Sequence, residues 1–164
     1  MIIIVPLNAK CLAIVLHAAQ NRFTPMNQAP ADVLIVEDDE PTQSFLRAIC
    51  KRFGYTSFSA GDGEEAKEHL DGHSEWRVIL LDLYLPKCDG FEVIDFTKRN
   101  APHLLLRTII VTAGGERDIE RARNLKLVHC VLRKPIDIYE LNAKMHECAA
   151  RGAQPRASQR SRAV

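Results

Sequence analysis

The sequence lacks an apolar run that approaches the roughly 18 residues of a membrane-spanning helix, so no membrane association is expected. Its five cysteines form no C-x-x-C pair and are odd in number. Neither a disulfide framework nor a zinc site is therefore expected. The cysteines instead favour a reducing, cytoplasmic environment. Acidic residues are missing from both ends of the chain, since none occurs in residues 1–31 or 149–164.

The charge that is present is unevenly distributed. The 164 residues carry a formal net charge of +1, with 22 basic and 21 acidic side chains. Six of the basic residues lie in 1–31 and 149–164, so residues 32–148 carry five more acids than bases. Because an acidic surface repels phosphate, no nucleic-acid partner is expected. The arginine-rich segment 149–164 has no apolar periodicity and is predicted to be a basic disordered tail.

Residues 1–31 form an N-terminal extension for which no domain is predicted. Its apolar parts are interrupted by Pro6 and Lys10, which argues against a secretory signal peptide. Met26 offers an alternative start of translation immediately before the first clearly patterned segment.

Between residues 32 and 148, strand-like and helix-like segments alternate five times. Short apolar runs predict strands at 33–36, 55–59, 78–81, 108–112 and 128–132. Helices are expected after each strand, with N-cap signatures at Asp62 and Asp137. Such repetition predicts an α/β fold with a five-stranded parallel sheet and helices on both faces. We adopt the flavodoxin-like, doubly wound (βα)5 order 2-1-3-4-5, in which ligands bind beyond the carboxyl ends of the strands.

Polar residues follow four of the predicted strands. Glu37 and Asp38 follow the first, Asp82 the third and Lys134 the fifth, while Thr112 ends the fourth. Converging carboxylates repel one another unless a cation lies among them, and oxygen ligands suit Mg²⁺. A lysine and a hydroxyl nearby would neutralise a phosphoryl group, and an aspartate can accept one as an acyl phosphate.

Each of these residues also has an ordinary structural explanation when taken alone. Acids such as Glu37 and Asp38 suit the N-terminus of a helix. Thr112 can simply end a strand, and a lysine before a proline is commonly solvated. Asp82 is harder to explain in this way, since an aspartate that closes a buried strand needs a partner. Their joint occurrence at strand ends favours a functional site.

Four motifs in this order resemble the receiver domain of two-component response regulators. They are Val-Leu-Ile-Val-Glu-Asp-Asp at 33–39, Ile-Leu-Leu-Asp-Leu-Tyr-Leu-Pro-Lys-Cys-Asp-Gly at 79–90, Ile-Ile-Val-Thr-Ala at 109–113, and Lys134-Pro135. The resemblance covers residues 32–148. It implies a signalling switch rather than a metabolic enzyme. Because only 16 residues follow Cys148, too few for an output domain, a single-domain response regulator is expected.

The resemblance also implies roles for individual residues. Asp82 matches the phosphoacceptor, and the implied metal cofactor is Mg²⁺ or Mn²⁺. Asp38 matches its direct acidic ligand, Glu37 an acid that acts through water, and the Tyr84 carbonyl a further ligand. Tyr84 is larger than its counterpart in many relatives, at a position that affects hydrolysis of the phosphoryl group.

The remaining matches concern the phosphoryl group and the switch. Lys134 matches the lysine that contacts a phosphoryl oxygen, and its bond to Pro135 is usually cis in the family. Thr112 matches the hydroxyl that moves toward the phosphoryl group, and Ala113 a position kept small. Val131 departs from the family, which often has an aromatic switch residue there.

The implied partners are a sensor histidine kinase and a downstream target protein. Output is expected through a conformational switch of the surface formed by the helix at 116–125, the strand at 128–132 and the helix after Asp137. One alternative is a phosphorelay shuttle that passes the phosphoryl group to a histidine phosphotransfer protein.

Three further hypotheses depart more strongly from a phosphorylated switch. A phosphatase of the haloacid dehalogenase type also uses an aspartate after an apolar strand, but it needs an acid where Tyr84 stands. A degenerate receiver would bind partners without phosphorylation, although the acids, threonine and lysine are all present. A flavodoxin-like cofactor carrier would need a loop rich in Ser, Thr and Gly after the first strand, and none is there.

Overall fold

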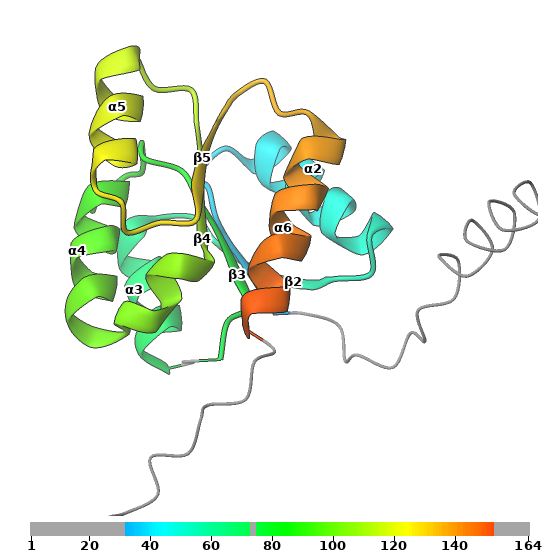
Figure 1. Ribbon diagram of the computed structural model, residues 1–164, viewed down its shortest axis with the longest axis horizontal. Coiled ribbons are helices and arrows are strands. Elements are labelled where there is room, and N and C mark those ends of the chain that lie inside the picture. The colour runs from blue at the N-terminus through cyan, green and yellow to red at the C-terminus, as the bar shows by residue number, and fades with distance from the viewer. Residues whose placement is uncertain (1–31, 73–74, 153–164) are drawn as a thin grey trace, which may run out of the picture.

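The computed structural model describes residues 32–72 and 75–152, and its centre is a five-stranded parallel sheet (Figure 1). The strands lie in the order β2-β1-β3-β4-β5, so the predicted fold class and strand order are confirmed. Their bounds are Asp32–Val36 for β1, Thr56–Ala60 for β2, Val78–Leu81 for β3, Thr108–Thr112 for β4 and Cys130–Arg133 for β5.

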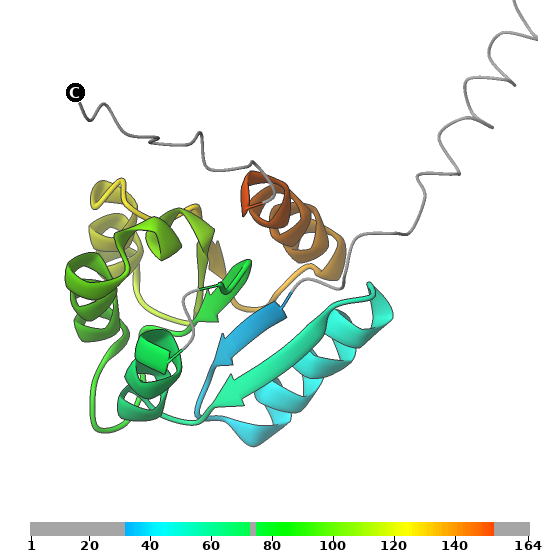
Figure 2. The ribbon, with the colours of Figure 1, turned by 90° about the horizontal axis from the view of Figure 1, so that it is seen from below.

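Helices cover both faces of this sheet (Figure 2). They are α2 (Glu40–Arg52), α3 (Gly63–Gly72), α4 (Gly90–Asn100), the 3-10 helix η1 (Pro102–Arg107), α5 (Glu116–Asn124) and α6 (Ile138–Gly152). Helices α2 and α6 share one apolar cluster, while α3, α4, η1 and α5 contribute to the cluster on the opposite face. The sheet therefore separates two cores.

The central strands explain this arrangement. Successive side chains of a strand point to opposite faces. Leu34 and Val36 accordingly enter the core beneath α3, α4 and α5, whereas Val33 and Ile35 enter the core beneath α2 and α6. All residues of β3 and β4 are buried, as expected for strands that are covered on both sides.

Aspartate side chains cap the N-termini of α3 and α6, where the sequence predicted helix starts. Oδ1 of Asp62 accepts hydrogen bonds from the backbone N–H groups of Glu64 and Glu65, both over 2.9 Å. Oδ1 of Asp137 accepts hydrogen bonds from the backbone N–H groups of Tyr139, over 2.8 Å, and Glu140, over 2.9 Å. Both caps satisfy N–H groups that have no partner inside the helix, which confirms the two predicted signatures.

Several elements differ from the prediction. Strand β1 begins at Asp32, one residue earlier than expected, and β2 spans Thr56–Ala60, one residue later at each end. Strand β5 begins at Cys130, two residues later than expected. Helix η1 was not predicted, because three consecutive leucines after Pro102 show no helical period, although Leu104 and Leu105 are buried. Helix α6 extends past the predicted boundary at residue 148, since Ala149 still packs against the core. The predictions for residues 1–31 and 153–164 lie outside the described residues.

Four cysteines, Cys50, Cys88, Cys130 and Cys148, are free thiols within the described ranges. Burial raises the pKa of Cys50 and of Cys130 to about 11, so these two thiols stay protonated at neutral pH. In the same ranges no helix has both the length and the apolar character that crossing a bilayer requires.

Gly90 allows α4 to begin against the backbone of the residue that follows β3. A methyl group at position 90 would lie 2.4 Å from the carbonyl oxygen of Asp82 and 2.7 Å from Cα of Leu83. We expect Gly90→Ala to lower the free energy of unfolding by about 2 kcal/mol, because rigid backbone must shift to admit the methyl group. Urea unfolding measures this loss.

The matched control for this prediction is Gly115→Ala. No heavy atom lies within 4 Å of a methyl group at position 115, and the φ angle of −67° there suits alanine. The change in unfolding free energy should stay below about 1 kcal/mol, the cost of placing alanine at an N-cap. Equal stability of the two variants would show that the contact at Gly90 is not limiting.

Candidate functional site

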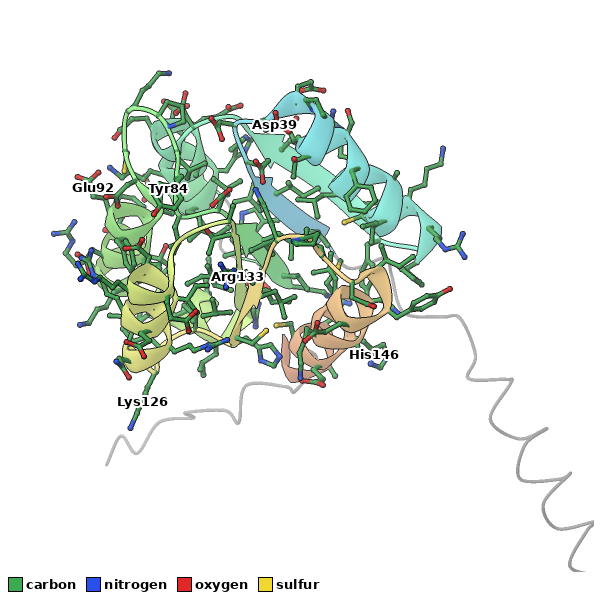
Figure 3. The ribbon with its side chains drawn as sticks, turned by 90° about the horizontal axis from the view of Figure 1, so that it is seen from above. Asp39, Tyr84, Glu92, Lys126, Arg133 and His146 are labelled. Carbon is green, nitrogen blue, oxygen red and sulfur yellow. The ribbon has the colours of Figure 1, made fainter. Side chains whose placement is uncertain are left out.

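The residues predicted to form the site come from four strands whose carboxyl ends share one edge of the sheet. Glu37 and Asp38 follow β1, and Asp82 follows β3. Thr112 ends β4, and Lys134 follows β5. Figure 3 views the molecule from above, with Asp39 labelled at the start of α2 and Tyr84 on the side of α4 and α5. Parallel pairing brings residues that are distant in sequence to this edge.

A half-buried lysine joins two of the predicted carboxylates. Nζ of Lys134 lies 2.7 Å from Oε2 of Glu37 and 2.6 Å from Oδ2 of Asp82. The side chain of Lys134 is 19% exposed, that of Glu37 2% and that of Asp82 6%, so water screens these ion pairs weakly. These contacts connect Lys134 to Glu37, which lies 97 residues earlier in the sequence, and to Asp82, which lies 52 residues earlier. The peptide bond between Lys134 and Pro135 is cis.

The Asp82 carboxylate is held at both oxygens. Oδ1 accepts hydrogen bonds from the backbone N–H groups of Leu83, over 2.6 Å, and of Tyr84, over 3.2 Å. Oδ2 accepts the bond from Lys134, and the backbone N–H of Asp82 donates to the carbonyl of Val36 over 3.0 Å. The carboxylate therefore has a fixed orientation at the end of β3.

Burial and pairing act in opposite directions on the charges of this cluster. Burial raises the pKa of Glu37, and the hydrogen bond and charge of Lys134 only partly offset this effect. Burial also lowers the pKa of Lys134, but its hydrogen bonds to Asp82 and Glu37 outweigh this and place the pKa above its ordinary value. The lysine is therefore charged at neutral pH.

The oxygen donors near Asp82 fit a hard divalent cation. Asp38 is exposed, and its side chain has no hydrogen-bond partner within the described ranges. Glu37, in contrast, is engaged by Lys134. In residues 32–72 and 75–152, no three Cys, His, Asp or Glu side chains are grouped so that they could hold a metal by themselves. Mg²⁺ needs only one or two carboxylates and keeps several waters, so Asp38, Asp82 and the Tyr84 carbonyl suit it.

Thr112 is fully buried and bonded within its own loop. Its Oγ1 accepts a hydrogen bond from the backbone N–H of Gly114 over 3.2 Å. Its carbonyl accepts one from the N–H of Lys134 over 2.9 Å, which links the ends of β4 and β5. Ala113 is exposed beside it, and Val131 is partly buried against the core.

A pocket of about 380 Å³ extends from this edge toward α5, and sequence reasoning did not find it. Its lining combines residues from the site with residues of α4 and α5: Asp38, Leu83, Tyr84, Leu85, Pro86, Asp89, Phe91, Asp118 and Arg121. The Arg121 guanidinium lies 3.8 Å from the centre of the Phe91 ring. No local pattern in the sequence indicates such contacts, because their partners are far apart along the chain.

Comparison with known proteins connects this geometry to a family. Residues 33–146 match the response regulator receiver domain. The alkaline phosphatase synthesis transcriptional regulatory protein PhoP of Bacillus subtilis is 30% identical over 114 residues, which are 69% of this chain and 46% of PhoP. The chain thus spans less than half the length of that relative.

Two further comparisons agree. Sporulation initiation phosphotransferase F of Bacillus subtilis is 34% identical over 116 residues, 66% of this chain and 86% of that protein. The receiver domain of a sensor histidine kinase from Pseudomonas aeruginosa, solved with a magnesium ion in its active-site cleft, has a TM-score of 0.67 at 22% identity. That alignment covers 74% of this chain and 99% of the solved one. The chain therefore belongs to the response regulator receiver domain family.

Proposed function

We propose that Asp82 accepts a phosphoryl group from a phosphohistidine of a sensor histidine kinase. The observation that carries this proposal is the contact of Lys134 with Asp82 at 2.6 Å, at a carboxylate whose other oxygen is fixed by backbone N–H groups. A carboxylate oxygen of Asp82 forms the new bond to phosphorus, and the P–N bond of the donor breaks. The electron pair of that bond stays with the histidine nitrogen.

The other residues act by position and charge. Lys134 donates to the oxygens of the arriving phosphoryl group, and the Thr112 hydroxyl moves toward it afterwards. Ala113, a small exposed residue, leaves room for the group to enter. These roles follow the family's motif at each position and the places of these residues at one edge of the sheet.

Mg²⁺, or Mn²⁺, is the proposed metal. Asp38, Asp82 and the Tyr84 carbonyl would hold it, and Glu37 would act through water. A bound divalent cation supplies charge neutralisation between the carboxylates and the phosphoryl oxygens. The magnesium ion in the Pseudomonas aeruginosa receiver domain supports this assignment.

Phosphorylation is proposed to shift an equilibrium between two arrangements of the surface made by α5, β5 and α6, where a downstream protein binds. Transfer onward to a histidine phosphotransfer protein is the second candidate function. The 34% identity to a sporulation phosphotransferase, of which this chain covers 86%, favours that second function. We place the reaction in the cytoplasm, and we propose a signalling switch rather than a metabolic enzyme.

Incubation with acetyl phosphate and Mg²⁺ tests the proposal. We expect intact-mass spectrometry to show the addition of one phosphoryl group, which hydroxylamine removes because an acyl phosphate is labile to it. Omission of Mg²⁺ with added chelator should prevent labelling. Absence of a label under saturating donor and Mg²⁺ would overturn the phosphoacceptor assignment, and turnover of a phosphate monoester would favour a phosphatase.

A further inference from the structure

The Tyr84 side chain connects the segment after β3 to helix α5. Its hydroxyl donates a hydrogen bond to Oδ2 of Asp118, 34 residues away, over 2.6 Å. Tyr84 is 57% exposed, so water is able to replace this bond when it breaks. Figure 3 shows Tyr84 on the side of the molecule where the green α4 and the yellow α5 lie. The bond thus joins the phosphoacceptor loop directly to a helix of the proposed output surface.

The ring of Tyr84 also packs on the loop that joins β4 to α5. A methyl group at position 114 would lie 3.0 Å from Cε2 of Tyr84 and 3.4 Å from Oγ1 of Thr112. Gly114 itself donates its N–H to that oxygen over 3.2 Å. The aromatic ring, the glycine backbone and the threonine hydroxyl therefore lie in contact in this order.

We propose that the hydrogen bond between Tyr84 and Asp118 is a latch that holds the 113–115 loop in its resting position, and that phosphorylation of Asp82 opens it. This inference rests on the proposed function. The latch assigns a role to the side chain of Tyr84 that is separate from the role of its carbonyl oxygen.

The direction of the effect follows from the packing. Thr112 must give up its bond to Gly114 before its hydroxyl can turn to a phosphoryl group, and the loop must follow. The Tyr84 ring covers this loop as long as Asp118 holds its hydroxyl. An interaction that stabilises only the resting arrangement lowers the affinity for any ligand that requires the other one. Loss of the latch should therefore strengthen binding of a phosphoryl mimic.

Beryllofluoride in saturating Mg²⁺ is a suitable mimic, and its affinity is measured in the wild type, Tyr84→Phe, Asp118→Ala and the double variant. Tyr84→Phe removes the hydroxyl and keeps the ring. We expect each single variant to bind about three- to tenfold more tightly, as for loss of one exposed hydrogen bond, and the double variant no more tightly than the singles. Tyr55→Phe, which removes the hydroxyl of a half-buried tyrosine just before β2, at the opposite end of the strand from the site, is the control and should bind like the wild type.

A second measurement examines the variant in the absence of metal. The chain has three tyrosines, so ¹³C-labelled tyrosine should give three NMR signals, and Tyr84→Phe identifies the Tyr84 signal by its loss. In metal-free Asp118→Ala, we expect the Tyr84 signal to move from its wild-type position toward the position that it takes in the wild type with bound beryllofluoride. A Tyr84 signal that is the same in metal-free wild type and Asp118→Ala would overturn the latch.

The outcomes separate the latch from the proposed function. If the wild type binds beryllofluoride and both single variants bind it equally well, the latch is refuted and the proposed function stands. Weaker binding in the variants would also refute it, because the bond would then belong to the bound state. A wild type that binds no beryllofluoride would overturn the proposed function and the latch together.

Discussion

Replacing Asp82 with asparagine is expected to abolish labelling by acetyl phosphate, with a loss of at least about 100-fold relative to the wild type. The amide is too weak a nucleophile to form an acyl phosphate. The fold should survive, because the amide oxygen can still accept the N–H groups of Leu83 and Tyr84, and Lys134 keeps Glu37 as its partner. Mass spectrometry after incubation with donor and Mg²⁺ measures the loss.

Asp39→Asn is the matched control for this change. Asp39 is an exposed acid next to the site, and its Oδ2 caps α2 by accepting from the N–H of Thr42 over 2.9 Å. Asparagine caps helices about as well as aspartate. This variant should be labelled like the wild type, and equal labelling of Asp82→Asn would place the phosphoryl group on another residue.

Lys134→Met is expected to destabilise the protein more than Gly90→Ala does. It leaves the buried carboxylates of Glu37 and Asp82 facing each other without their cation. Removing one partner of a buried ion pair costs on the order of 3 kcal/mol. Urea unfolding at pH 8, without divalent cations, measures the difference from the wild type.

The sign of the pH dependence distinguishes this cause from a loss of packing. The pKa of Glu37 is already raised by burial, and removal of Lys134 raises it further. A carboxyl group with a raised pKa penalises the folded state at high pH, and the penalty disappears as pH falls through that pKa. The loss should therefore be smaller at pH 5 than at pH 8. Adding Asp82→Asn should recover part of it at pH 8, and a loss that is independent of pH would contradict this explanation.

The sequence was informative where a structural element is local. The apolar runs that end at Asp82 and Thr112 predicted buried strands, because burial on both faces leaves several consecutive apolar residues, four before Asp82 and three before Thr112. Parallel order then brought the residues after the strands to one edge. In such sheets ligands bind beyond the carboxyl ends of the strands, whatever the side chains are. The edge of the sheet that carries the candidate site could therefore be predicted from the strand order alone.

What the sequence could not predict depends on distant pairs. Asp118 and Arg121 are three residues apart on α5 and face the segment after β3, but nothing near them in the sequence indicates Tyr84 or Phe91 as partners. The engagement of Glu37 by Lys134 is similar, since the resemblance to the family implied for Glu37 only an acid that acts through water. Which oxygen lies beside which cation depends on the packing of side chains from segments that are distant in the sequence.

Lys134 gives the domain its own internal counter-ion. A pocket of converging acids usually needs an external cation to fold without electrostatic strain. Here an ammonium group from the end of β5 already sits between two buried carboxylates. We therefore expect the resting fold to form without divalent ions, and we expect such ions to serve the chemistry of the site.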